Sequence, residues 1–287
     1  MIASAVVIKR YATLLAAALL LGASCGSGND LIVGVTTSVH DTGLLDVLTE
    51  AFREESGYDV AAVTPIIAGS GQILELARRG ELDAVITHSP QAEAQLIMDG
   101  DGIDRREIMQ NRFVLVGPPD DPAGVRSVAT ASEALERIAA VERTFISRGD
   151  NSGTHIRELA LWGQAGIDPV GQPWYQESGA GQGQSLLVAS DKGAYTLVDS
   201  STFTVFQERL ALEPYVFDEE PNRYSIIRVS PEKHNVNEAA ALAFADFLTS
   251  PIAQRIIAEF GRERYEEPLF VVASIASEGD PAATPER

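Results

Sequence analysis

The chain has 287 residues, a formal net charge of −19 and one cysteine, and 45% of its residues are hydrophobic. A protein this acidic is soluble and binds nucleic acid or anionic lipid poorly, so we expect no nucleic-acid partner. A single cysteine excludes an intrachain disulfide, and the length allows one large domain or two smaller ones.

The first 24 residues have the pattern of a secretory signal peptide. Lys9 and Arg10 precede an apolar run over residues 12–21. That run is too short to span a bilayer as a helix, but it has the length of the apolar core of a signal peptide. We therefore predict an exported protein with a signal peptide over residues 1–24.

Cys25 follows this segment, and a lone cysteine at the end of a signal peptide is the acceptor position of bacterial lipoproteins. We expect a lipidated Cys25 and a short linker over residues 25–29. The protein would then be anchored to the outer face of the cytoplasmic membrane or lie in the periplasm. Gly22 departs from the aliphatic residue usual three positions before such a cysteine. The alternative is an ordinary cleaved signal with an incidental cysteine.

Strands and helices alternate along the rest of the chain. Apolar runs predict strands at 31–35, 60–67, 84–87, 112–117, 144–147, 194–198 and 224–229. Helical spacing predicts helices at 42–55, 72–79, 91–98, 132–140, 154–164, from the glycine-rich loop 177–183 to 191, and at 237–248 and 251–260. Gly57 and Gly80 fit helix ends, and residues 36–39 read as a turn. This order predicts an α/β fold, with a disordered tail over 273–287.

Three loops place small hydroxyl or glycine residues at the start of a helix. They are Thr36-Thr37-Ser38, Gly69-Ser70-Gly71 and the segment from Ser147 to Thr154. The first amides of a helix have no internal acceptor and carry partial positive charge, hydroxyls add donors, and glycine lets the backbone approach a ligand. The loops therefore indicate an anion site. The alternative for each one is an ordinary helix N-cap.

Arg148 strengthens the prediction of an anion site. Its planar guanidinium can offer a fixed fork of donors to an oxoanion. The alternative is a surface ion pair with Asp150, two residues later.

At these loops the chain resembles the tungstate-binding proteins of ABC importers (TupA type), within the type II periplasmic binding proteins. The segments that carry the resemblance are TTSVHDTGLLDVLTEAF (36–52), GSGQILELARRGELDAVITHSP (69–90), RREIMQNRFVLVGPPDDPAG (105–124), FISRGDNSGTHIRELALWGQAGIDP (145–169) and GQGQSLLVASDKGAYTLVD (181–199).

The resemblance implies two lobes, each a mixed sheet flanked by helices, joined by two crossing segments that act as a hinge. The first lobe would comprise 30–112 plus 225–272, and the second 113–224. The anion would lie in the cleft between the lobes. The implied ligand-binding residues are Thr37, Ser38, Ser70, Arg148, Ser152, Gly153 and Thr154.

Two positions depart from the family pattern. An arginine is usual after the aspartate that ends the third strand of the second lobe, but Asp199 is followed by Ser200 and Ser201. Val39 and His40 stand where small or polar residues are expected. His40 is interpreted as a solvent-facing loop residue, with a ligand role as the alternative.

Tungstate is favoured over phosphate by the turn after the strand 84–87. Phosphate carries a proton at neutral pH, and related phosphate binders offer a carboxylate there. The turn Thr87-His88-Ser89-Pro90 has no acid. Tungstate and molybdate carry no proton, so a facing carboxylate would repel them. His88 is interpreted as structural, with a ligand role left open. Molybdate is the second choice, and a phosphate- or sulfate-binding protein is the alternative.

An enzyme is not expected. Ser152 and Ser70 lack the surroundings of a nucleophile, and His155 should point away from the cleft. His155 and Glu158 lack a second histidine at metal-site spacing. We expect no cofactor, no bare metal ion and a monomer. Its partners would be an ABC permease and its ATPase. A sensor that does not transport is the remaining alternative.

Overall fold

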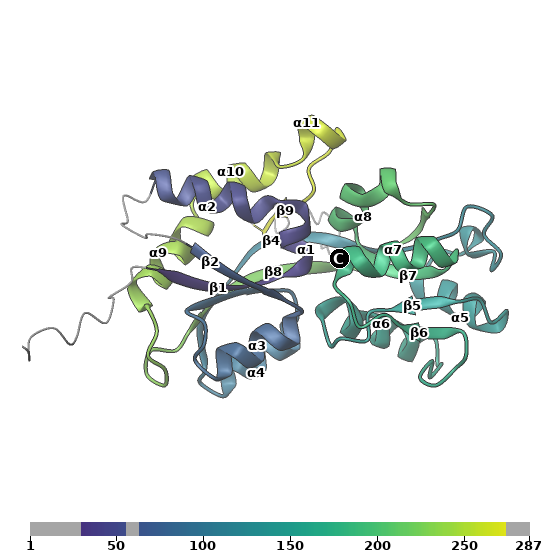
Figure 1. Cartoon of the computed structure of the whole chain (residues 1–287), viewed down its shortest axis with the longest axis horizontal. Coiled ribbons are helices and arrows are strands. Elements are labelled where there is room, and N and C mark those ends of the chain that lie inside the picture. The colour runs from purple at the N-terminus through teal and green to yellow at the C-terminus, as the bar shows by residue number, and fades with distance from the viewer. Residues whose placement is uncertain (1–29, 56–62, 274–287) are drawn as a thin grey trace, which may run out of the picture.

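The computed structural model describes residues 30–55 and 63–273 as two lobes built on one sheet (Figure 1). The predicted signal peptide, Cys25, the linker, Gly57 and the tail from 274 lie outside the described residues. Within the described part, no helix is long and apolar enough to cross a membrane.

The strands form a mixed sheet in the order β2-β1-β3-β8-β4-β7-β5-β6, with β9 paired to β4. Their bounds are β1 Leu31–Thr36, β2 Val63–Ala68, β3 Ala84–Thr87, β4 Gly102–Gly117, β5 Phe145–Ser147, β6 Tyr175–Glu177, β7 Tyr195–Asp199, β8 Glu213–Val229 and β9 Val271–Val272.

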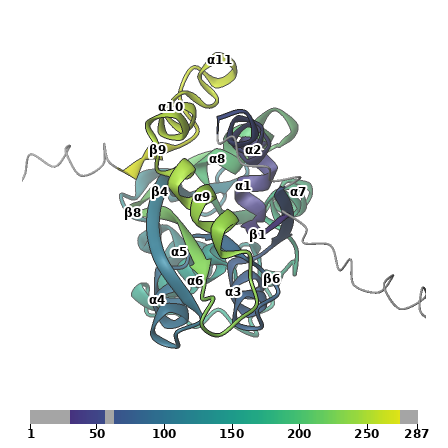
Figure 2. The ribbon, with the colours of Figure 1, turned by 90° about the vertical axis from the view of Figure 1, so that its left-hand side faces the viewer.

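The helices are α1 Thr37–Thr42, α2 Leu44–Glu55, α3 Ser70–Arg78, α4 Pro90–Met98, α5 Ala131–Ala140, α6 Gly153–Gln164, α7 Gln182–Lys192, α8 Ser200–Phe206, α9 Glu238–Leu248, α10 Pro251–Glu259 and α11 Arg262–Tyr265. In the first lobe, α2, α9 and α10 cover one face of the sheet, and α3 and α4 cover the other (Figures 1 and 2). Helices α5 to α8 belong to the second lobe.

Each lobe has its own core. In the first lobe, Phe52 of α2 packs edge-on against Phe244 of α9, with ring centroids 5.1 Å apart. In the second lobe, Phe145 of β5 packs against Trp162 of α6 at 5.2 Å. The first core draws on both ends of the chain, because β1 and α2 pack against α9 and α10.

Two long strands, β4 and β8, run antiparallel through both lobes and join them. At the passage from one lobe to the other, Asn111 pairs with Asn222 and Arg112 with Pro221. Beyond this passage β3 flanks β8 in the first lobe, and β7 flanks β4 in the second. These two strands are therefore the crossing segments, and the sheet continues through the hinge.

Several elements differ from the sequence-based expectation. The strands expected at 112–117 and 224–229 are only the apolar ends of β4 and β8. The expected turn at 36–39 is the start of helix α1, and α3 begins at Ser70 rather than at residue 72. The sequence did not predict β6 or α8. These two elements were missed because each is too short to show a repeating pattern of apolar residues.

Candidate anion-binding site

Four helix N-termini meet where the lobes touch: α1 and α3 of the first lobe, and α6 and α7 of the second. Thr37, the first residue of α1, lies with its Oγ1 3.4 Å from Nη2 of Arg148 and 3.5 Å from the backbone N of Gln182. A Cβ on Gly69, the N-cap of α3, would lie 3.3 Å from Cβ of Ser152. The structure thus brings the three predicted loops together at the contact between the lobes.

Three of the six buried side-chain atoms that have no hydrogen-bond partner among the described residues are donors in the predicted loops, from both lobes. They are Ser70 Oγ at the start of α3, Arg148 Nε after β5, and Thr154 Oγ1 in the first turn of α6. Their residues are 0%, 2% and 1% exposed. An unmet buried donor costs about 1–3 kcal/mol, so three at one interface require an explanation. An anion that accepts from them supplies one.

Arg148 is held on three sides and is not part of a surface ion pair. Its Nη1 donates to Oε1 of Gln182 at 3.2 Å, and its Nη2 donates to Oδ2 of Asp150 at 2.6 Å and to Thr37 Oγ1. Asp150 also accepts the backbone N–H of Ser152 at 3.1 Å. The carboxylate therefore orients Arg148 and holds the loop in place, while Nε has no partner in the part of the chain that the structure describes.

The other predicted site residues have different roles. The hydroxyl of Ser152 accepts the backbone N–H of His155 at 3.3 Å as the N-cap of α6. The hydroxyl of Ser38 accepts from Tyr224 at 3.1 Å. Both hydroxyls accept in these contacts, so each serine still has its O–H hydrogen as a donor, in addition to the backbone N–H groups of the helix start. A Cβ on Gly153 would lie 2.6 Å from the carbonyl O of His88, so this contact between lobes needs glycine.

A buried chain of hydrogen bonds leads from the site through the hinge. Tyr224 O–H donates to Ser38, and Asn222 Nδ2 donates to Tyr224 at 3.0 Å and to Oδ1 of Asn111 at 2.7 Å. Asn111 Nδ2 in turn donates to Oδ1 of Asp199 at 2.9 Å. The chain links α1 of the first lobe to the end of β7 in the second, and burial raises the pKa of Asp199.

The serines after Asp199, where the family usually has arginine, lie at the hinge. Ser200 Oγ accepts the backbone N–H of Arg112 at 3.4 Å, and Ser201 Oγ donates to the carbonyl O of Leu269 at 3.1 Å.

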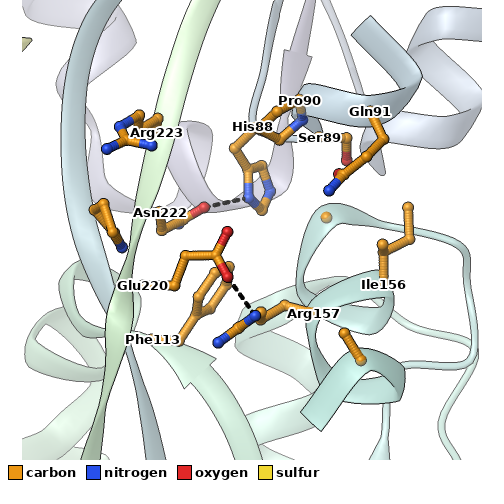
Figure 3. A pocket seen from close by; sticks show the side chains of 13 residues that line it. His88, Ser89, Pro90, Gln91, Phe113, Ile156, Arg157, Glu220, Asn222 and Arg223 are labelled. Atoms are coloured by element: carbon orange, nitrogen blue, oxygen red, sulfur yellow. Dashed lines mark hydrogen bonds and ion pairs between the residues drawn. The ribbon is translucent and has the colours of Figure 1, made fainter. Parts of the chain in front are cut away.

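His88 is a hinge residue with a hydrogen bond at a strand end. Its Nδ1 lies 2.7 Å from Oδ1 of Asn222, its ring stacks on Tyr224 at 4.9 Å, and burial lowers its pKa to about 4. It lines a small pocket of about 80 Å³ between the start of α4, helix α6 and β8 (Figure 3). An ion pair between Arg157 and Glu220 lies at the edge of this pocket. His40 is exposed.

No nucleophile–base pair forms at Ser152. The ring Nδ1 of His155 accepts the backbone N–H of Asn151 at 3.1 Å, so the ring folds back on its own loop. In residues 30–55 and 63–273 no group of three His, Cys, Asp or Glu side chains is placed to hold a metal ion.

Glu158, considered in the sequence only together with His155 as a metal site, supports the loop from Ser147 to Thr154. Its carboxylate accepts from Ser147 Oγ at 2.8 Å, Tyr175 O–H at 2.7 Å and Trp162 Nε1 at 3.2 Å. Burial raises its pKa to about 7. Ser147 Oγ also accepts the backbone N–H of Gly149 at 3.2 Å, so Glu158 fixes the start of the loop that carries Arg148.

Sequence reasoning assigned no role to Gln182, Asp41 or Asn222. All three act through contacts far apart in the chain, such as the 3.2 Å contact from Gly183 N to Asp41 Oδ2. For Gln182, the glycine-rich loop that opens the predicted helix up to residue 191 is a sequence signal.

Residues 22–251 match the family model of a PBP superfamily domain. The chain is 39% identical to the tungstate-binding protein TupA of Peptoclostridium acidaminophilum, over 84% of each chain. Among solved structures, it is similar to the tungstate ABC transporter protein of Geobacter sulfurreducens, with 40% identity, a TM-score of 0.73 and coverage of 80% of this chain and 98% of that one. It is also similar to the tungstate-binding protein TupA of Desulfovibrio alaskensis G20, with 34% identity, a TM-score of 0.68 and coverage of 85% and 98%.

Proposed function

Since the chain belongs to the PBP superfamily and, within it, to the TupA-type tungstate-binding proteins, we propose that it captures tungstate as a tetrahedral oxoanion for an ABC importer. The observation that carries the proposal is the set of unpartnered buried donors, Ser70 Oγ, Arg148 Nε and Thr154 Oγ1, at the contact between the lobes. Hydrogen bonds to a charged acceptor contribute roughly 1.5–3 kcal/mol each. Several of them would offset the dehydration of a dianion.

The hydrogen bonds of the carboxylates of Asp150 and Glu93 favour a ligand that carries no proton. Asp150 is engaged by Arg148 and by the backbone N–H of Ser152. Glu93, next to the turn after β3, accepts from Thr87 Oγ1 and Ser89 N at 2.9 Å each and from Arg105 at 2.8 Å. Carboxylates engaged in this way do not offer an acceptor for the proton of phosphate. This favours tungstate, with molybdate second, over phosphate.

In this mechanism the anion binds the helix starts of one lobe first, then bridges to the other lobe, and the lobes close by bending at β4 and β8. The loaded, closed monomer would dock on an ABC permease driven by its ATPase. Lipidation of Cys25 would keep the protein near the membrane. The protein would act by binding alone, without turnover.

The test is isothermal titration of the purified protein with tungstate, molybdate, sulfate and phosphate at neutral pH. The expected result is one-to-one binding of tungstate and no measurable binding of sulfate or phosphate. Binding of phosphate would favour a phosphate carrier of the same fold. Binding of no oxoanion would overturn the proposal. Tungstate uptake that persists in cells lacking the protein would favour a sensor.

A further inference from the structure

Helix α7 begins without a cap of its own. Its N-cap is Gly181, which has no side chain to accept the first amides. In the closed structure, side chains of the first lobe accept hydrogen bonds from these backbone N–H groups. Gln182 N–H points to Thr37 Oγ1 at 3.5 Å, and Gly183 N–H donates to Oδ2 of Asp41 at 3.2 Å. A carboxylate is the favoured partner for a helix N-terminus, so α1 supplies the cap that α7 lacks.

The fit between α1 and α7 is close. A Cβ on Gly181 would lie 3.2 Å from Cγ2 of Thr37, and a Cβ on Gly183 would lie 2.5 Å from the ring of Phe206. Gly181 therefore lets the start of α7 approach α1, whereas Gly183 lets α7 pack against α8 of its own lobe. Because the two helices belong to different lobes, this cap exists only when the lobes are closed.

Asp41 is unexpected at this position. Burial raises the pKa of its carboxyl group, while the N–H of Gly183 and the charge of Arg148 act in the opposite direction, and the group lies beside a cleft proposed to hold a dianion. The chain already carries a net charge of −19. A carboxylate that only repelled the ligand would be a defect, whereas one that stabilises the closed form would slow release.

We propose that Asp41 is a positioning residue that latches the closed form by capping α7 across the cleft, and that it thereby sets the rate at which the bound oxoanion leaves. This inference rests on the proposed function. The latch and simple repulsion predict opposite effects. If Asp41 only repels, its removal slows dissociation, and if it latches the lobes, its removal speeds dissociation.

The experiment compares wild type, Asp41→Ala and Asp41→Asn, with Asp46→Asn as the matched control, because Asp46 is an exposed acid nearby in α2. Cysteines at two exposed positions, Glu54 in the first lobe and Glu136 in the second, carry a pair of fluorophores after Cys25→Ser. Energy transfer between them reports closure. Dissociation is followed in a stopped-flow instrument, with excess unlabelled wild-type protein to trap the released tungstate.

We expect Asp41→Ala to raise the dissociation rate about tenfold and to raise the association rate less than about threefold. Asp41→Asn keeps an acceptor without the charge and should fall between wild type and Asp41→Ala. Asp46→Asn should match wild type. A dissociation rate that is unchanged or lower in Asp41→Ala would overturn the latch. If Asp41→Ala does not fold, Asp41→Asn decides by the same criterion.

The failure of the latch can be told apart from the failure of the proposed function. If wild type binds no tungstate, the proposed function fails. The latch is then judged from energy transfer in the unliganded protein. A smaller closed fraction in Asp41→Ala than in wild type would support it, and an equal fraction would overturn it.

Discussion

Arg148 and Asp150, two residues apart, form an ion pair at 2.6 Å in which the arginine side chain is only 2% exposed. The pair holds the guanidinium so that Nε has no partner among the described residues. Asp150 therefore acts as an anchor for the arginine, although it is a negative charge at an anion site.

The first prediction concerns Arg148→Ala. The variant loses the Nε donor and leaves Asp150 without its partner beside the ligand, so tungstate affinity should fall about 100-fold or more. Isothermal titration measures the loss, and a thermal melt checks the fold. His40→Ala, an exposed change in α1, should alter affinity little. Unchanged affinity in Arg148→Ala would refute the site.

Removal of the unpartnered hydroxyls of Ser70 and Thr154 should weaken ligand binding without lowering the stability of the unliganded protein. Ser70→Ala and Thr154→Val should each lower affinity about tenfold, because each removes a donor to a charged acceptor. Neither should lower the free energy of unfolding of the unliganded protein, because an unmet buried group is removed. Chemical unfolding and titration measure the two quantities.

The matched control for the hydroxyls is Thr196→Val in β7. Its buried hydroxyl donates to the carbonyl O of Ile146 at 2.8 Å. This change should cost about 1 kcal/mol of stability and leave affinity unchanged. If Ser70→Ala behaved like Thr196→Val, the hydroxyl of Ser70 would be structural and the site assignment would fail there.

Gly153→Ala should block closure. Its Cβ would lie 2.6 Å from the carbonyl O of His88, a backbone atom that cannot move aside cheaply. We expect at least a tenfold loss of tungstate affinity. Gly163→Ala in the same helix is the control, since nothing lies within 4 Å of its Cβ position, and it should gain up to about 1 kcal/mol of stability. Equal affinities for the two variants would contradict the predicted contact.

Glu158 predicts a dependence of stability on pH. Burial raises its pKa in the folded protein to about 7, from 4.5. Between these values the folded state holds a proton that the unfolded state has lost. The stabilisation of the folded state by this bound proton is therefore complete below about pH 4.5, and it is lost as the pH rises to about 7. The loss is of order 3 kcal/mol.

Urea unfolding at several pH values from 4.5 to 8 tests this dependence. Glu158→Gln should flatten the profile relative to wild type, while Glu136→Gln, at an exposed position of α5, should leave it unchanged. Parallel profiles for wild type and Glu158→Gln would show that Glu158 does not titrate in this range.

The sequence predicted those parts of the fold and site that are local in the chain. The loop from Ser147 to Thr154 can be read from its own residues, because a helix start and an adjacent arginine make the signal. The contacts of Gln182 and Asp41 could not be read, since Gln182 meets Arg148 across 34 residues and Asp41 meets Gly183 across 142 residues. The first part of β4 was also missed, because its run Asp104-Arg105-Arg106 is polar and the strand is defined by pairing with β8.

The crossing strands also fix the order in which the chain can fold. The second lobe uses one unbroken stretch of sequence, whereas the core of the first lobe needs β1 and α2 near the start and α9 and α10 near the end. During synthesis from the N-terminus, residues 31–55 are made about 200 residues before α9 and α10, against which they pack. Contacts between segments this far apart in the sequence form slowly. We expect the second lobe to fold first and to serve as the template on which β4 and β8 assemble the first.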